Sequence, residues 1–325
     1  MTKEKIQQLL DKISDLRSAI QERIFGQQEV LDQLLITFIS GGHALLEGVP
    51  GLAKTMMIRS LAEASAVQFR RIQFTPDLMP TDIIGTEILR TDSKTGDRNF
   101  QFNKGPIFSN IILADEINRT PPKTQAALLE AMQERSVTYA GHTYEMSPPF
   151  FILATQNPIE QSGTFPLPEA QLDRFLLYII VDYPQEQEEF DILKATTGNL
   201  APTIEAVIDA EEIISIQGLV REVSISDQLI QYVNRLVRAT RPQTSEETFI
   251  QEWVQWGAGP RAGQALILAA KANALLKGRF AVIPEDIHRI AYPVLRHRIL
   301  LNFKAEAEEK KTDWITQQLL ESIKL

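Results

Sequence analysis

Short apolar runs alternate with helical patterns in the first half of the chain. Residues 1–23 carry apolar side chains at helical spacing, which predicts a leading amphipathic helix. A short strand is expected at His43–Leu46 and a helix from Lys54 to about Ala66. Further strand candidates, separated by helical stretches such as Lys123–Gln133, are Gln68–Gln73, Ile111–Ala114, Phe150–Ala154 and Phe175–Val181. This alternation is typical of a parallel sheet covered by helices, so an α/β domain is predicted for residues 1–184.

After Val181 the pattern becomes helical. Asp182-Tyr183-Pro184 interrupts the last strand, and strand-like runs almost vanish beyond it. Candidate helices are Gln185–Thr197, Ala210–Glu222, Ser226–Thr240, Arg261–Lys277, Pro284–Leu295 and Ala305–Ile323. We therefore expect a second, mainly α-helical domain over residues 185–325, with a hinge at about residues 183–186.

Composition narrows the possible functions. A chain of 325 residues is long enough for two separately packed domains. The net charge is −9, with an acidic excess in both halves, which argues against non-specific nucleic-acid binding. The absence of cysteine excludes disulfides, thiolate zinc sites and cysteine nucleophiles. The leading helix is unlike a signal peptide, and the longest uncharged apolar stretch, Leu34–Leu46, is shorter than the ~20 residues of a membrane span. A cytoplasmic protein without a membrane span is expected.

The segment after the first strand has the spacing of a phosphate-binding loop. Its residues are Gly48, Val49, Pro50, Gly51, Leu52, Ala53, Lys54 and Thr55. Glycines let backbone N–H groups face a phosphate, the lysine neutralises the β and γ oxygens of ATP, and the threonine ligates Mg²⁺. An ordinary glycine-rich turn would explain Gly48 and Gly51 but not Lys54 and Thr55. Ala53 departs from the usual pattern, which has glycine there.

Two carboxylates end the apolar run Ile111–Ala114. At the carboxyl edge of a parallel sheet, Asp115 is expected to hold Mg²⁺ through water and Glu116 to polarise the attacking water. The alternative is a helix cap, since both residues suit a first helical turn. The next strand runs into Asn157, which can orient the water against the γ-phosphate or simply form a turn before Pro158.

Two arginines are candidates for phosphate contacts. Arg174 follows a short helix just before the last strand, and Arg261 opens a helix in the second domain. An arginine that enters the site on closure can raise the rate of phosphoryl transfer by ~10³ to 10⁵. The alternative for either is a surface salt bridge, and Asp173 lies next to Arg174 for that purpose.

These residues together resemble the AAA+ superfamily and, within it, the MoxR family of ATPases. The resemblance extends over most of the chain, and Ala53 is the usual residue of this family. The motifs that carry it are Ile24–Gln27, Glu47–Thr55, Thr75–Asp82, Gly105–Phe108, Leu113–Arg119, Ala154–Pro158, Leu167–Phe175 and Gly259–Arg261.

The resemblance implies a role for each candidate. Asn157 would be the sensor-1 residue, Arg174 the arginine finger and Arg261 the sensor-2 arginine, and Ile24 and Gly26 would lie near the adenine. Whether Arg261 reaches its own nucleotide or a neighbour's stays open. The family implies a ring, commonly a hexamer, with Arg119 and Glu169 as plausible interface residues, and the helical domain as its lid.

The same resemblance implies ATP-driven remodelling or maturation of a protein client, frequently one with a von Willebrand factor A domain. A DNA-directed motor or loader is the enzymatic alternative, and a nucleotide-gated scaffold is the non-enzymatic one. The segments Asp77–Phe102, with a polar turn at Asp92–Arg98, and Ser136–Met146, turning at Ala140-Gly141-His142, are inserts that either push on a substrate or form passive surface hairpins.

Some other groups are expected to be structural. The four histidines lack the spacing of a metal cluster, and Trp253 and Trp256 are expected to pack within the lid. A local basic patch is expected to serve an inter-subunit or nucleotide face, with nucleic-acid binding as the alternative; its residues are Arg289, Arg296, His297 and Arg298.

Overall fold

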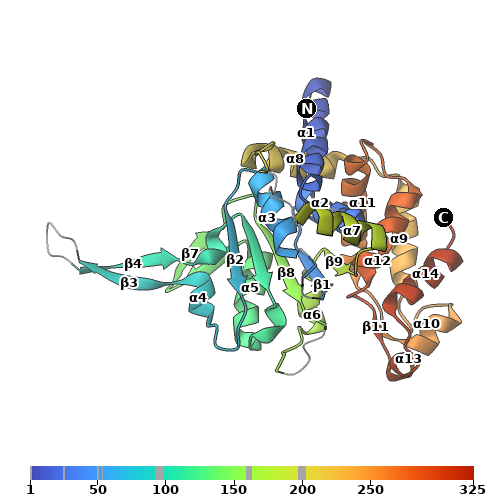
Figure 1. Ribbon diagram of the computed structural model, residues 1–325. Coiled ribbons are helices and arrows are strands. Elements are labelled where there is room, and N and C mark those ends of the chain that lie inside the picture. Colours follow the sequence, from blue (N-terminus) through green and yellow to red (C-terminus); the bar gives the residue numbers. More distant parts are fainter. Residues whose placement is uncertain are drawn as a thin grey trace.

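A parallel sheet forms the centre of the first half of the molecule (Figure 1). The computed structural model describes residues 2–24, 26–49, 51–52, 54–91, 98–158, 163–196 and 203–325. Within them, the strands of this sheet, in hydrogen-bonded order, are β2 (Phe69–Gln73), β5 (Ile111–Asp115), β8 (Phe151–Gln156), β1 (Ala44–Gly48) and β9 (Leu177–Val181). All neighbouring strands are parallel, so their carboxyl ends share one edge of the sheet. The predicted α/β fold is confirmed.

Helices cover both faces of the sheet. Side chains of β5 alternate between two apolar clusters: Ile111 and Leu113 belong to one, and Ile112 and Ala114 to the other. The first cluster contains α1 (Lys3–Gln21), α2 (Gln28–Ile39) and α3 (Lys54–Ala64), and the second contains α5 (Pro122–Glu134) and Ile83 of α4 (Pro80–Ile84). Burial on both faces is the physical reason for the uninterrupted apolar runs of these strands.

The second half is mainly helical, as predicted. Its helices are α7 (Glu186–Thr196), α8 (Ala210–Glu222), α9 (Asp227–Ala239), α10 (Thr248–Trp253), α11 (Pro260–Leu276), α12 (Pro284–Leu295), α13 (Phe303–Ala307) and α14 (Thr312–Ser322). Ser226 caps α9 by accepting a hydrogen bond from the Leu229 backbone N–H at 3.3 Å. Helix α10 and the two-stranded sheet of β10 (Val254–Trp256) and β11 (Leu300–Leu301) were not predicted.

The single helix expected over Ala305–Ile323 is wrong. Glu309 has a left-handed backbone, with φ of 53°, and it separates α13 from α14. The Lys310 N–H donates to the Ala305 carbonyl at 2.9 Å, which is the closing bond of a Schellman-type helix end. A residue other than glycine in this conformation gives little warning in the sequence that the helix stops there.

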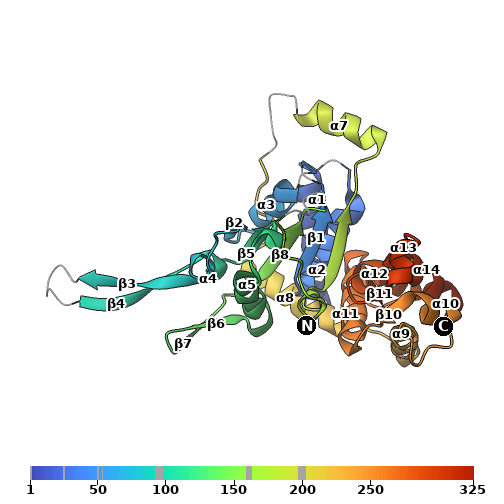
Figure 2. The ribbon, with the colours of Figure 1, turned by 90° about the horizontal axis from the view of Figure 1, so that it is seen from below.

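Two antiparallel hairpins project from the core. The longer one, β3 (Gly85–Thr91) with β4 (Arg98–Lys104), extends far from the sheet, and its turn at residues 92–97 lies outside the described residues (Figures 1 and 2). The shorter one, β6 (Ser136–Tyr139) with β7 (His142–Glu145), turns at Ala140 and Gly141, both with positive φ, as predicted. Phe102 of the long hairpin stacks on Tyr144 of the short one, with ring centroids 4.4 Å apart. The two hairpins therefore contact each other at their bases.

The helical half is held to the sheet by arginines. Arg296 donates to the Tyr178 carbonyl of β9 at 2.6 Å, and Arg289 pairs with the buried Asp32 of α2 at 2.8 Å. Arg298, with a side chain only 4% exposed, pairs with Asp173 at 2.8 Å, and His297 is buried. These residues of the expected basic patch therefore join the two halves of the chain, and their role at an inter-subunit or nucleotide face stays a prediction. Trp253 packs in the lid as expected, whereas Trp256 is 67% exposed.

Candidate nucleotide-binding and hydrolysis site

The loop between β1 and α3 leaves the sheet at its carboxyl edge. A side chain at Gly48 would meet the Val181 carbonyl oxygen of β9 at 2.8 Å, and Gly51 has φ of 89°, so glycine is required at both places. Val49 lines a small cavity beside β9, and Leu52 packs against the large apolar cluster. Pro50 and Ala53, also predicted to bind the nucleotide, lie outside the described residues.

Lys54 and Thr55 begin α3 and line a cleft above the sheet. The Lys54 ammonium donates to the Gly48 carbonyl at 2.5 Å, so the lysine folds back over its own loop. Burial lowers the pKa of Lys54, while the neighbouring Asp115, Glu116 and Glu47 act in the opposite direction. This half-buried cation is available to a phosphate at the amino end of α3, where the helix dipole also favours an anion.

Asp115 is the last residue of β5, and its carboxylate is held from two sides. One oxygen accepts from the Thr155 hydroxyl at 2.7 Å, and the other accepts from two nitrogens of Arg71 at 3.0 and 2.7 Å. Arg71 lies on β2, next to β5 in the sheet, with its side chain 49% exposed. The contact with Arg71 was not predicted, because the sequence does not say which strand lies beside β5.

Glu116 is held by both its backbone and its carboxylate. Its backbone is left-handed, with φ of 58°, and its N–H donates to the Thr155 hydroxyl at 2.9 Å. The carboxylate accepts from the Gln73 amide at 2.8 Å and from Arg119 at 3.0 Å. A residue other than glycine in this conformation costs about 1 kcal/mol or more, and the surrounding bonds keep it there. Glu116 starts no α-helix; it precedes the short 3₁₀ turn η2 (Ile117–Arg119), so neither carboxylate is an α-helix cap.

These groups share one cleft of about 440 Å³, and its lining includes Gly51, Lys54, Thr55, Arg71, Asp115, Glu116 and Asn157. Asn157 follows β8 and is 5% exposed. The predicted lysine, threonine, carboxylates and amide are therefore together, although they come from the start of α3, the end of β5 and the residue after β8. Their oxygen donors, a hydroxyl and a carboxylate, are ligands that suit Mg²⁺.

Ile24 and Gly26 lie where α1 joins α2. Ile24 is 5% exposed, and Gly26 has φ of 67°. Glu188 of α7 reaches this place: its carboxylate accepts from the Gln27 N–H at 3.3 Å, and its side chain is the nearest neighbour of Gly26. Neither Ile24 nor Gly26 is part of the lining of the cleft.

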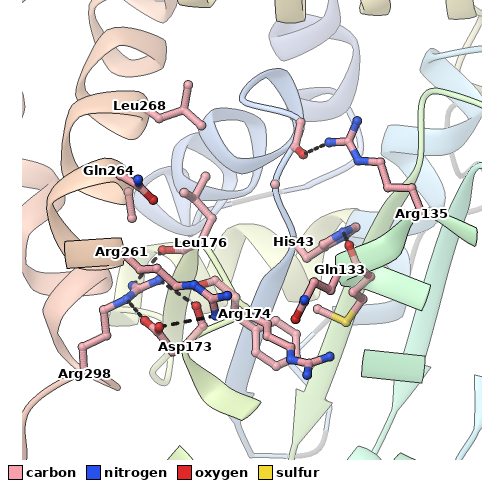
Figure 3. A pocket seen from close by; sticks show the side chains of 15 residues that line it. His43, Gln133, Arg135, Asp173, Arg174, Leu176, Arg261, Gln264, Leu268 and Arg298 are labelled. Atoms are coloured by element: carbon pink, nitrogen blue, oxygen red, sulfur yellow. Dashed lines mark hydrogen bonds and ion pairs between the residues drawn. The ribbon is translucent and has the colours of Figure 1, made fainter. Parts of the chain in front are cut away.

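Arg174 and Arg261 are not in the cleft. They line a second pocket of about 320 Å³, where β1 and β9 begin, so it lies at the amino edge of the sheet (Figure 3). Arg174 follows α6 (Glu169–Leu172) and donates to the Leu129 carbonyl at 2.5 Å. Arg261 approaches Asp173 at 3.7 Å. The structure thus separates the two arginines from Glu116 and Asn157 of the same chain.

Comparisons with known proteins agree with this geometry. Residues 43–177 match the family described as ATPase family associated with various cellular activities (AAA), and residues 246–319 match the AAA lid domain. The chain is 43% identical over 303 residues to Chaperone MoxR1 of Mycobacterium tuberculosis, covering 93% of this chain and 79% of that one. It is 31% identical over 308 residues to Protein MoxR of Paracoccus denitrificans, covering 90% and 89%.

A solved structure agrees as well. The crystal structure of a protein from Cytophaga hutchinsonii superimposes with a TM-score of 0.91 at 41% identity, covering 99% of this chain and 97% of that one. In the described part of the chain, no helix is long and apolar enough to cross a membrane. The predicted AAA+ core with a helical lid is confirmed, and the chain belongs to the MoxR family of AAA+ ATPases.

Proposed function

We propose that this chain hydrolyses ATP to ADP and phosphate in the cleft, in the presence of Mg²⁺. The convergence of Lys54, at the start of α3, with Asp115 and Glu116, at the end of β5, is the observation that carries the proposal. Lys54 and the loop N–H groups bind the phosphates, and Thr55 and Asp115 would hold Mg²⁺, which would neutralise charge on the phosphate oxygens. Glu116 takes the proton of the attacking water, and Asn157 orients that water.

The contacts of the carboxylates fit this assignment. Glu116 is bonded to Gln73 and Arg119, and Asp115 to Arg71, so side chains of the protein hold both carboxylates in place. Both bonds of Glu116 go to one carboxylate oxygen, Oε2. Because a carboxylate accepts at two oxygens, Glu116 can act as a base with these bonds in place.

We infer that the active form is a ring of copies. Arg174 and Arg261 are both at the amino edge of the sheet, whereas the cleft is at the carboxyl edge, so neither arginine serves the cleft of its own chain in this arrangement. A second copy that presents its pocket to the cleft would bring both arginines to the nucleotide. A hexamer, interface roles for Arg119 and Glu169, the division into domains at residue 184 and a cytoplasmic address stay predictions.

The client is proposed to be a protein. The relative named Chaperone MoxR1 supports a chaperone-like role, and the long hairpin carries exposed apolar side chains at Leu89 (51%) and Phe100 (72%). Leu89 and Phe100 are cross-strand partners, so they share one face of the hairpin. A remodelling or maturation step on a partner with a von Willebrand factor A domain is the specific hypothesis. The acidic net charge disfavours the alternative of a DNA-directed motor.

Steady-state ATPase assays test the proposal and its scaffold alternative. Glu116→Gln keeps the shape of the side chain and removes its basicity, so we expect a loss of ATP turnover of at least ~10² with ATP still bound. Lys54→Ala is expected to abolish ATP binding. A wild-type chain without ATPase activity, or a Glu116→Gln variant that turns over ATP normally, would refute the proposed hydrolysis. Co-purification with the ATP-loaded Glu116→Gln variant would identify the client.

A further inference from the structure

The pocket at the amino edge of the sheet is cationic. Among its lining residues are four arginines (Arg135, Arg174, Arg261 and Arg298) and a single carboxylate, that of Asp173. His43, which also lines it, adds no charge near neutral pH, because burial lowers its pKa to about 4. Since β1 is five residues long, this pocket lies roughly 16 Å or more from the phosphate-binding loop at the other end of that strand.

Only part of this charge is balanced inside the chain. Arg298 forms the floor of the pocket, where it pairs with Asp173 and donates to the Phe175 and Val294 carbonyls at 2.7 and 2.6 Å. Arg174, in contrast, has no carboxylate within ion-pair distance among the described residues, and its buried Nε has no hydrogen-bond partner there. The pocket therefore has an excess of arginine N–H donors over acceptors, which suits a polyanion.

Arg135 forms the opposite wall, where α5 ends (Figure 3). It is the first residue after α5, with a left-handed φ of 53°. Its N–H donates to the Ala131 carbonyl, its own carbonyl accepts from the Met146 N–H, both at 2.9 Å, and its guanidinium donates to the Gly41 carbonyl at 3.1 Å. No carboxylate in the described part of the chain pairs with it.

Glycine is the favoured residue at such a helix end, because it adopts a positive φ without a steric penalty. An arginine there is disfavoured by its backbone, and no ion pair with another described residue compensates for it. Strain of this kind is typical of functional positions. The fold holds a cationic side chain at the rim of the pocket although glycine would fit the backbone better.

We propose that Arg135 is a third cation, beside Arg174 and Arg261, for the polyphosphate of a nucleotide bound by an adjoining copy of the chain. The inference rests on the proposed ATPase ring and adds a catalytic residue to it. Arg135 and Arg174 are both fixed to the carboxyl end of α5, since Arg174 donates to the Leu129 carbonyl of that helix. Arg261 comes from α11 in the lid. The phosphates of the neighbour thus lie between cations of the core and of the lid.

The variant Arg135→Gly separates function from folding. Because glycine relieves the left-handed backbone, its unfolding temperature is expected to be equal to or higher than that of the wild type. Its ATPase kcat is expected to fall by at least about tenfold, as for the loss of one donor that stabilises transition-state charge. The matched control is Arg238→Ala, which removes an exposed arginine of α9 outside the pocket, and it is expected to retain wild-type activity.

A mixed assembly tests whether Arg135 acts on a neighbour. Differently tagged Arg135→Gly and Glu116→Gln chains are co-expressed and purified through both tags. In such assemblies, Arg135→Gly subunits receive an intact arginine from Glu116→Gln neighbours, so activity is expected to exceed the mean of the two homogeneous preparations severalfold. Wild-type kcat in Arg135→Gly, or no gain in the mixed assembly, would overturn this inference alone. An inactive wild type would instead overturn the proposed function.

Discussion

The Thr155 hydroxyl joins the two carboxylate residues of the cleft. It accepts from the Glu116 N–H at 2.9 Å and donates to the Asp115 carboxylate at 2.7 Å, and the residue is fully buried at the end of β8. Thr155→Val replaces this hydroxyl by a methyl group of nearly the same size. The variant therefore leaves one backbone donor and one carboxylate oxygen without their partner, while the packing of the sheet is preserved.

The expected cost follows from these two bonds. A neutral hydrogen bond contributes about 1 kcal/mol to stability, and one to a charged group about 1.5–3 kcal/mol. The Asp115 side chain is 14% exposed and also bonded to Arg71, so water and Arg71 recover part of the second bond. We expect a loss of about 2–3 kcal/mol, which for a chain of this size lowers Tm by on the order of 5 °C. ATP turnover should fall too, because Glu116 loses the bond that fixes its backbone.

Thermal unfolding of matched variants measures this effect. Thr37→Val is the control, since Thr37 is equally buried but donates only to the Gln33 carbonyl of its own helix, at 2.8 Å. The free energy of unfolding of Thr37→Val is expected to fall by no more than about 1 kcal/mol. If Thr155→Val unfolds at the same temperature as Thr37→Val and hydrolyses ATP like the wild type, the hydroxyl does not organise the two carboxylates and the reasoning is refuted.

Three further variants test other features. Arg71→Ala frees Asp115 from a half-exposed ion pair worth about 0.2–1 kcal/mol, so the Mg²⁺ concentration for half-maximal ATPase activity should fall by up to about fivefold; an unchanged Mg²⁺ requirement would contradict the pairing. His43 has a pKa of about 4 in the folded chain and 6.5 in the unfolded chain, so as the pH falls the unfolded chain takes up the proton before the folded chain does. The stability present above pH 6.5 is therefore lost as the pH falls towards 4, by roughly 3 kcal/mol at most. His43→Gln should make chemical denaturation midpoints less dependent on pH over this range, and an equally steep dependence would argue against it. Glu309→Gly should raise Tm, because glycine accepts the left-handed turn between α13 and α14 at a gain of about 1 kcal/mol; a lower Tm would show that this turn is not strained.

The sequence was sufficient to predict the elements of the cleft but not its internal bonds. Lys54, Asp115 and Glu116 each follow or end an apolar strand, and the parallel arrangement brings strand ends together. The positions of Arg71 and Gln73 depend on β2 lying beside β5, and that order is set by packing of the whole sheet. The pattern of apolar residues along one chain does not indicate this strand order.

The same limit applies to the contacts of the basic patch. Spacing near the end of α12 revealed clustered positive charge but not the carbonyls and Asp173 that accept from Arg298 across more than a hundred residues. Ala305–Ile323 was predicted as one helix, and residues 308–313, all polar, include neither glycine nor proline to mark a break. The break there is a single unusual backbone angle, and no residue type in the segment announces it.

Helix α5 runs from the cleft at the carboxyl edge of the sheet to the arginine pocket at the amino edge. Its 13 residues make a rod of roughly 20 Å. Near its amino end the buried Gln125 donates to the Ile117 and Thr120 carbonyls, directly after Glu116, and its carboxyl end carries the Arg174 anchor and Arg135. A shift of the loop after Glu116 in response to the γ-phosphate would therefore move α5, and with it Arg135 and Arg174, which face the nucleotide of the adjoining copy. In a ring, such a coupling through α5 would make ATP hydrolysis proceed from each subunit to its neighbour in one direction around the ring.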